Sequence, residues 1–139
     1  MRSHPMLGTL LILGACGGGR FYSTLTASPA TSPAEVMDCT RAQLRSLGYS
    51  MTSYDEVDFR MTARKADNDV KRPDPQFRRN LDRLEIQAAP GSDGKTTLTV
   101  TAHTFAEFET HRGPTEEEER ASAGARQSAQ AIVDSCGHT

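Results

Sequence analysis

Residues 83–102 read RLEIQAAPGSDGKTTLTVTA, and this stretch decides the fold. In its first part Leu84, Ile86 and Ala88 alternate with polar residues, which is typical of a strand that buries one face. Its last part repeats the alternation in a threonine-rich background, and β-branched residues favour strands. The segment Pro90–Gly94 between them is rich in turn-forming residues. The stretch therefore predicts two strands joined by a turn.

Two earlier stretches show related patterns. Three apolar residues alternate with three polar ones, namely Phe59, Met61 and Ala63 with Arg60, Thr62 and Arg64. Residues 49–54 form a weaker strand candidate. Because each predicted strand has one apolar and one polar face, we expect an antiparallel sheet that is covered on one side.

A first helix is predicted to begin just after Ser32. Ser32 can act as its N-cap, Pro33 suits the first helical position, and Glu35 stands at the third. One face of this helix carries Val36, Met37, Thr40, Leu44 and Leu47. Gly48 is a natural C-terminal stop.

A second helix is predicted near the end of the chain. Thr115 and Glu118 have the spacing of a capping box, and the acidic run Glu116–Glu119 would suit the positive end of the helix dipole. Small and apolar residues then recur at helical spacing, namely Ala121, Ala125, Ala129, Ile132 and Cys136. This mostly alanine stripe predicts a close approach to a neighbouring element.

These elements predict a single α+β domain over residues 32–139. The expected architecture is a two-layer sandwich with the order helix, four antiparallel strands, helix, and with both helices on one face of the sheet. The polar stretch Ala66–Arg78 is expected to be a long loop, either functional or mobile, and we favour a mobile one.

The N-terminal residues have the pattern of an export signal. Arg2 is followed by an apolar run from Met6 to Leu13, which is too short to cross a bilayer. Leu13-Gly14-Ala15-Cys16 resembles the lipobox of bacterial lipoproteins, and the resemblance covers only this segment. It implies that residues 1–15 are a removable signal peptide and that Cys16 carries the lipid, with further acylation of its amine. The alternative is an ordinary secretory signal.

The same resemblance implies a cellular location. No aspartate follows Cys16, which in Gram-negative lipoproteins is the default for export to the outer membrane. We therefore expect a protein attached to the membrane by its lipid at the periplasmic face of the outer membrane. The glycine-, serine- and proline-rich residues 16–31 are expected to form a flexible tether.

Cys39 and Cys136 are the cysteines that remain after Cys16. In an exported domain two cysteines are most simply a disulfide, which here would join the two helices. Two buried thiols or a redox pair are the alternatives, although the spacing is not that of a redox motif.

Composition argues against one class of partner. The 139 residues carry a formal net charge of −2, and no basic stripe interrupts the mixed charges. Nucleic-acid binding normally needs such a stripe, so no nucleic-acid partner is predicted.

No motif for catalysis or cofactor binding is present. The sequence lacks a nucleophile elbow, a zinc-protease helix and a phosphate-binding glycine loop. Residues that could bind a metal lie along one predicted strand at His103, Glu107, Glu109 and His111, but an extended strand holds the two histidines too far apart to share one ion. We predict no metal, no cofactor and no enzymatic activity.

The polar face of the predicted sheet is the most notable remaining surface. Arg60, Arg64 and Arg83 would gather there and could receive an anionic ligand, a glycan or a lipid headgroup. The simpler interpretation is an ordinary solvated face with Glu85 as counter-ion.

Three functional hypotheses result. The leading one is a non-enzymatic binding or assembly module of the cell envelope, which could act with another envelope protein. The second is a binder of a small anionic ligand or glycan on the arginine face. The third, a hydrolase, would need a concave site that joins His103 or His111 to a serine or aspartate.

Overall fold

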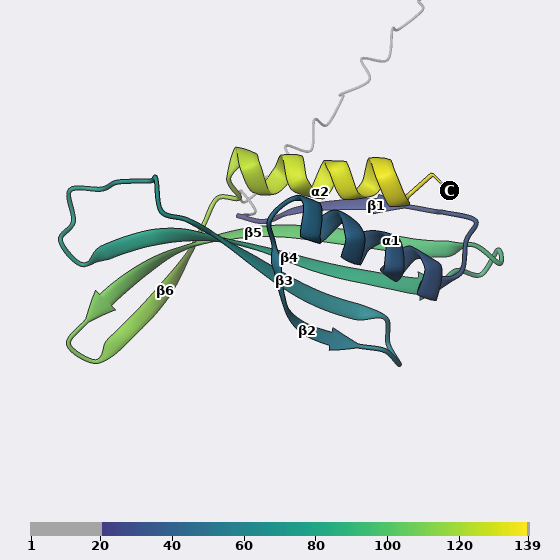
Figure 1. The fold of residues 1–139 in the computed structure, drawn as a ribbon, viewed down its shortest axis with the longest axis horizontal. Coiled ribbons are helices and arrows are strands. Elements are labelled where there is room, and N and C mark those ends of the chain that lie inside the picture. The colour runs from purple at the N-terminus through teal and green to yellow at the C-terminus, as the bar shows by residue number, and fades with distance from the viewer. Residues whose placement is uncertain (1–20, 139) are drawn as a thin grey trace, which may run out of the picture.

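The computed structural model describes residues 21–138 and shows an α+β fold with two helices and a six-stranded antiparallel sheet (Figure 1). The helices are α1 (Pro33–Ser46) and α2 (Ala123–Cys136). The strands are β1 (Ser23–Ala27), β2 (Ser50–Asp55), β3 (Arg60–Asp67), β4 (Phe77–Pro90), β5 (Thr96–Thr110) and β6 (Gly113–Glu119). The predicted signal peptide and Cys16 lie outside the described residues.

Strand β5 is the strand to which most of the sheet is hydrogen-bonded. On one side it pairs with β4, from Phe77 opposite Phe108 to Pro90 opposite Thr96. Its other side is divided, because β1 pairs with residues 98–102 and β6 with residues 104–110. Strands β3 and β2 follow beyond β4. The predicted turn at 90–94 therefore joins the two longest strands.

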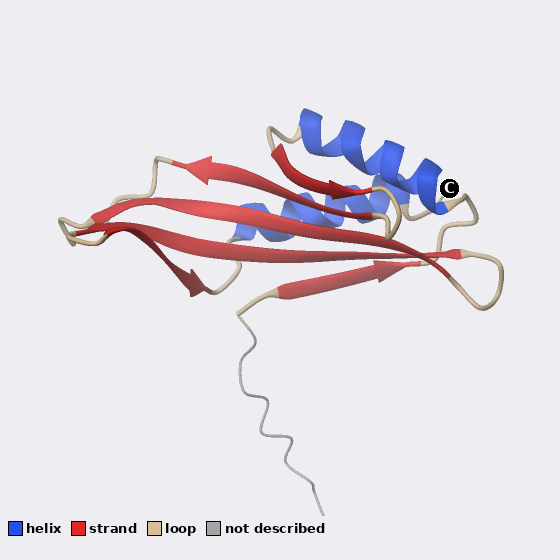
Figure 2. Ribbon diagram, turned by 90° about the horizontal axis from the view of Figure 1, so that it is seen from below, coloured by secondary structure: helices blue, strands red, loops and turns tan. Residues whose placement is uncertain are grey.

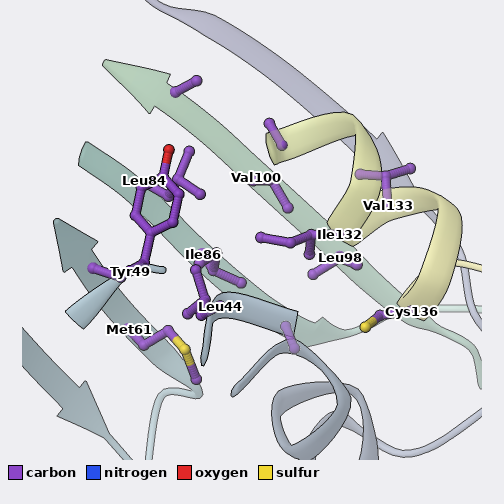
Figure 3. Close-up of a cluster of buried hydrophobic side chains, with 14 of the residues drawn as sticks. Leu44, Tyr49, Met61, Leu84, Ile86, Leu98, Val100, Ile132, Val133 and Cys136 are labelled. Atoms are coloured by element: carbon purple, nitrogen blue, oxygen red, sulfur yellow. The ribbon is translucent and has the colours of Figure 1, made fainter. Parts of the chain in front are cut away.

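Both helices lie on the same side of the sheet in Figure 1, and they contact each other as well as the strands. Figure 2 shows the strands from the uncovered side. The side chains under the helices are those whose alternation predicted the strands, and Leu84, Leu98 and Val100 are completely buried (Figure 3). The sheet near β6 extends beyond the helices, so part of it lacks that second layer.

Helix α1 follows its prediction closely. The Ser32 side chain accepts a hydrogen bond from Glu35 N, and the Glu35 carboxylate accepts one from Ser32 N, which together form a capping box. The helix ends before Gly48, whose φ of +82° is a backbone conformation that glycine adopts without strain. The predicted apolar face is the buried one, with Val36 and Leu44 in the core.

The first correction concerns the predicted tether. Residues 23–27 form β1 instead of a flexible segment, and their register places Ser23 opposite Ala102 and Ala27 opposite Leu98. Leu25 and Ala27 pack against the core. The sequence did not predict this strand, because serines and prolines surround its short alternating pattern. Its partner β5 also lies more than 70 residues away, so no local signal indicates the pairing. The folded domain therefore begins before residue 32.

The second correction concerns the start of the last helix. The acidic run Glu116–Glu119 belongs to β6, and α2 begins only after Ser122, whose side chain accepts a hydrogen bond from Ala125 N. The Thr115 and Glu118 spacing is thus not a helix cap. The sheet therefore has six strands and not the predicted four. The predicted stripe from Ala121 to Cys136 is nevertheless buried against the sheet.

The third correction concerns the bounds of the stretch Ala66–Arg78, which we expected to be one long loop. Strand β3 continues to Asp67 and β4 begins at Phe77, so the connection is shorter. Arg72 secures it, because its guanidinium lies 4.6 Å from the centre of the Phe77 ring and forms a bidentate pair with Glu119. A further hydrogen bond of 3.3 Å reaches Asn80.

The disulfide between Cys39 and Cys136 is present and joins α1 to α2 across 97 residues of sequence. Closing a loop of that length removes conformational freedom from the unfolded chain and is worth roughly 4–5 kcal/mol in the chain-entropy model. We predict that Cys39→Ala with Cys136→Ala lowers the free energy of unfolding by about that amount, measured by urea denaturation. A reductant should destabilise the natural protein and leave the double variant unchanged. An equal urea midpoint for both proteins would contradict the prediction.

The pairing of Arg72 with Glu119 predicts a pH dependence. The Arg72 hydrogen bond lowers the pKa of the Glu119 carboxyl, while partial burial opposes this. A carboxyl whose pKa is lower in the folded state stabilises the protein above its unfolded pKa, and that stability is lost as pH falls through the folded pKa. We predict that Glu119→Gln costs about 1 kcal/mol at neutral pH and nothing in strong acid, measured by urea denaturation at both.

Glu117→Gln is the matched control for this prediction. Glu117 is a neighbouring exposed carboxylate of β6, and it has no ion pair or hydrogen-bonded side-chain partner within residues 21–138. Its replacement should leave the stability unchanged at both pH values. Equal losses for the two variants would mean that the Arg72 contact does not stabilise the connection.

Candidate functional site

The three predicted arginines share the uncovered face of the sheet, but only Arg64 and Arg83 lie side by side there. Arg64 of β3 and Arg83 of β4 are register partners, and both contact the Glu116 carboxylate of β6, Arg83 at 3.2 Å. Arg60 lies further along β3, where the Gln87 amide, with its oxygen turned toward Arg60, accepts hydrogen bonds of 3.1 and 3.2 Å. Two of the three guanidinium groups therefore already have an anionic partner.

Sequence reasoning missed Glu116 as that partner, because it placed the acidic run on a helix. The strand alternation of β6 sends Glu116 and Glu118 to the same face as the arginines, and the next ion pair on that face joins Arg79 to Glu107 at 3.0 Å. Positive and negative side chains thus alternate across the face. This arrangement gives little field to attract a free anion.

A shallow depression remains beside Arg60. It has a volume of about 340 Å³, and its polar lining consists of Arg60, Thr62, Glu85, Gln87, Thr99 and Thr101. Hydroxyl, amide and mixed charged groups of this kind can hydrogen-bond a neutral polyol as readily as an anion.

The histidines do not form a common site. His103 is on the uncovered face, where its ring lies 5.5 Å from the Tyr22 ring and its Nδ1 lies 2.7 Å from Glu118 Oε1. His111 is exposed in the connection between β5 and β6. Within residues 21–138 neither ring hydrogen-bonds a serine or an aspartate, which the hydrolase hypothesis requires. No group of three or more potential metal ligands gathers in the same described part of the chain.

A larger cavity than the depression beside Arg60 lies on the other side of the sheet, at the edge of the helical layer. Its volume is about 700 Å³, within the range of small-molecule sites. The polar side chains in its lining are Tyr49, Lys65, Asp67, Asn68, Asp69, Asp82, Gln127 and Ser128. They come from the connection between α1 and β2, from the end of β3 and the residues after it, from β4 and from α2, so four separate segments form this cavity.

Asp82 is the buried carboxylate of the cavity, with only 8% of its surface exposed. Its Oδ1 accepts hydrogen bonds from Thr104 Oγ1 at 2.7 Å and from Ser122 Oγ at 2.9 Å. Thr104 Oγ1 in turn accepts one from Ser122 N at 2.8 Å. Since Ser122 is the N-cap of α2, this network fixes the start of the helix over the sheet.

The second oxygen of Asp82 is differently placed. No residue in the described part of the chain hydrogen-bonds to Oδ2. A Cβ built on Gly124, in the first turn of α2, would lie 3.8 Å from it. Because Gly124 has no side chain, this carboxylate oxygen is not covered from the helix. One oxygen of Asp82 is therefore structural, and the other is available to the cavity.

Tyr49 supplies a second buried polar group. The residue is 7% exposed, and its Oη has no hydrogen-bond partner of good geometry among the described residues. Burial raises the pKa of the Tyr49 hydroxyl; Ser128 opposes the rise and Asp82 adds to it. In Figure 3 the hydroxyl points away from Met61 and Leu44, past Leu84. The Tyr49 hydroxyl therefore interacts with Ser128 without a hydrogen bond of good geometry, and a buried hydroxyl in that position is stabilised by a better partner.

A sequence signal for this site existed. Asp82 has the same parity as Leu84, Ile86 and Ala88, so it is a charged residue at a position that the alternation assigns to the core. Such a residue needs partners, and these are non-local. The pattern could therefore have marked Asp82 as unusual, but not the cavity around it.

Comparisons with known proteins add no identification. No protein-family model matches this chain, and no curated protein matches it either. Neither helix within residues 21–138 is long and apolar enough to cross a bilayer.

The Asp82 network predicts different effects for two substitutions. Asp82→Ala removes the acceptor for two hydroxyls and should lower the free energy of unfolding by about 2–3 kcal/mol. Asp82→Asn keeps one oxygen that can accept both hydrogen bonds, so it should cost clearly less. Urea denaturation of the three proteins measures the difference. Similar losses for the two variants would show that the negative charge, and not the acceptor, holds α2 in place.

Proposed function

We propose that this protein is a lipid-anchored protein of the bacterial cell envelope that acts by binding, without catalysis. The observation that carries the binding role is the cavity above Asp82, which is preformed and lined by polar groups whose hydrogen-bonding capacity is partly unused. The partner is then either a free small molecule or a group presented by another envelope protein. The disulfide that joins α1 to α2 also limits the relative movement of the two helices next to the cavity, which suits such a role.

The lipobox at residues 13–16 supports the anchor. Strand β1 begins at Ser23, so only residues 17–22 separate Cys16 from the sheet. Six residues span at most about 20 Å, which would keep the domain near the bilayer surface. Phe21 and Tyr22, at the entry to β1, are 56% and 40% exposed and suit a position at the level of the lipid headgroups.

The arginine face supports a second candidate, a binder of a glycan or a small anion. The depression beside Arg60 is the observation in its favour. Glu116 weakens the case for an anion, because it already contacts Arg64 and Arg83. Binding of a soluble glycan that is lost in Arg60→Ala would favour this candidate over the cavity.

The anchor is tested by replacing the lipidated residue. The natural protein should fractionate with membranes, resist extraction by salt, and show the mass of the mature chain plus acyl groups. Cys16→Ser should accumulate as a precursor of unmodified mass, because the acceptor thiol is gone. Gly18→Ser, next to the lipobox but outside it, is the control and should be processed normally. A Cys16→Ser protein that is trimmed and released like an ordinary secreted protein would contradict the anchor.

A further inference from the structure

We propose that the cavity above Asp82 binds a protonated amine carried on a short hydrocarbon chain. The proposal rests on the binding role given above and adds the chemical class of the ligand. Three features of the cavity support it: its charge, the hydrogen-bonding capacity that Asp82 and Tyr49 retain, and the mixture of polar and apolar walls.

The charged lining of the cavity is mainly acidic. Asp67, Asp69 and Asp82 face a single cation, Lys65. Lys65 Nζ donates a hydrogen bond of 2.9 Å to the Leu47 carbonyl oxygen and lies 5.7 Å from the centre of the Tyr49 ring. No ion pair joins any of the three aspartates to a cation within residues 21–138. A cavity with this excess of negative charge attracts a cationic ligand and repels an anionic one.

Asp82 provides the main acceptor. Its Oδ1 is occupied by the two hydroxyl donors from Thr104 and Ser122, which leaves Oδ2 for a ligand. An ionised carboxylate can only accept hydrogen bonds, and an ammonium group can only donate them. The charge-assisted bond between them is stronger than a bond between neutral groups.

The role of Asp82 as a brace for α2 does not account for all of these groups. That role uses Oδ1 and the Ser122 cap; within residues 21–138 no hydrogen bond reaches Asp82 Oδ2, and Tyr49 Oη, which lies beside Ser128, has no hydrogen-bond partner of good geometry. Both residues are more than nine-tenths buried. Tyr49 lies near enough to Asp82 for the two groups to interact electrostatically, and its Oη can accept an N–H of a ligand that Asp82 binds.

The remaining walls define the rest of the ligand. Leu47, Ala66 and Ala131 give the cavity an apolar part beside the acidic one. A volume of about 700 Å³ is larger than a single ammonium group needs. An alkylamine places methylene groups on these side chains and leaves a second polar end near Asp67 and Asp69 at the rim.

A matched series of four-carbon compounds tests the charge selection. Putrescine, 1,4-butanediol and succinate have similar length and carry two positive charges, none, and two negative charges. Each is titrated into the mature full-length protein in mild detergent, with binding followed by calorimetry. We expect putrescine to bind, the diol to bind at least about ten-fold more weakly, and succinate not to bind. Added salt should weaken the binding of putrescine.

Two variants locate the site. Asp82→Asn should weaken putrescine binding at least about ten-fold. If that variant is poorly folded, Gly124→Ala gives an independent test, since its methyl would contact Asp82 Oδ2 at an ordinary 3.8 Å and cover it without strain. It should also weaken binding while leaving the fold intact. Asp38→Asn removes the same charge from an exposed position on α1 outside the cavity lining and should bind normally.

The possible outcomes distinguish failure of this ligand proposal from failure of the proposed binding function. Putrescine binding that is lost in both cavity variants and kept in Asp38→Asn would support the proposal. Equal binding of the amine and the diol, or succinate binding in the cavity, would overturn the ligand class and leave the binding role standing. Unchanged putrescine affinity in both cavity variants would overturn the site. No binding of any of the three compounds would overturn the proposal, and the binding role would then fall only if purified membranes also yielded no ligand or partner.

Discussion

The pairing of β4 with β5 is the interaction on which the rest of the structure depends. Its register runs without a break from Arg79 to Pro90, and every other strand attaches to one of these two strands or to a strand beside them. Strand β5 is long enough to pair with β1 along one half and with β6 along the other. A single antiparallel pair thus supplies the hydrogen-bonding edges for both ends of the sheet and aligns the apolar side chains that the helices cover.

The helical layer ends where the inward-facing side chains of β4 and β5 change from apolar to polar. Leu84 of β4 and Ala102 of β5 are register partners in the core, and the next inward-facing pair along the strands is Asp82 and Thr104. A buried carboxylate in this position is tolerated because Thr104 and Ser122 hydrogen-bond to it. The same network sets the first turn of α2. The cavity is thus a consequence of how the helix is attached, and the unpaired oxygen of Asp82 remains at its edge.

In the part of the sheet beyond the helices, ion pairs between strands accompany an edge-to-face contact between the Phe77 and Phe108 rings, whose centres lie 5.8 Å apart. Four consecutive glutamates in β6 would repel one another, but β-strand alternation sends them to opposite faces. On one face Glu116 contacts two arginines, and on the other Glu119 pairs with Arg72, which also covers the Phe77 ring. Each acidic side chain that has a cationic partner thus joins β6 to a strand or connection distant in sequence. This distribution also leaves the uncovered face close to electrical balance.

Local sequence patterns determined the elements that their own residues specify. The capping box and apolar face of α1, the alternation in β3, β4 and β5, and the alanine stripe of α2 are all periodic or short-range signals, and cysteine number indicated the disulfide. The tertiary structure alone decided the rest. Strand β1 has too little pattern to be distinguished from a linker without β5 beside it, and the acidic run of β6 suits a helix start equally well until its arginine partners are in place. The Asp82 cavity required four separate segments to meet. Periodicity is a property of residues that are neighbours in the sequence. The partner of a strand, the counter-ion of a charge and the wall of a cavity depend instead on residues that only folding brings together.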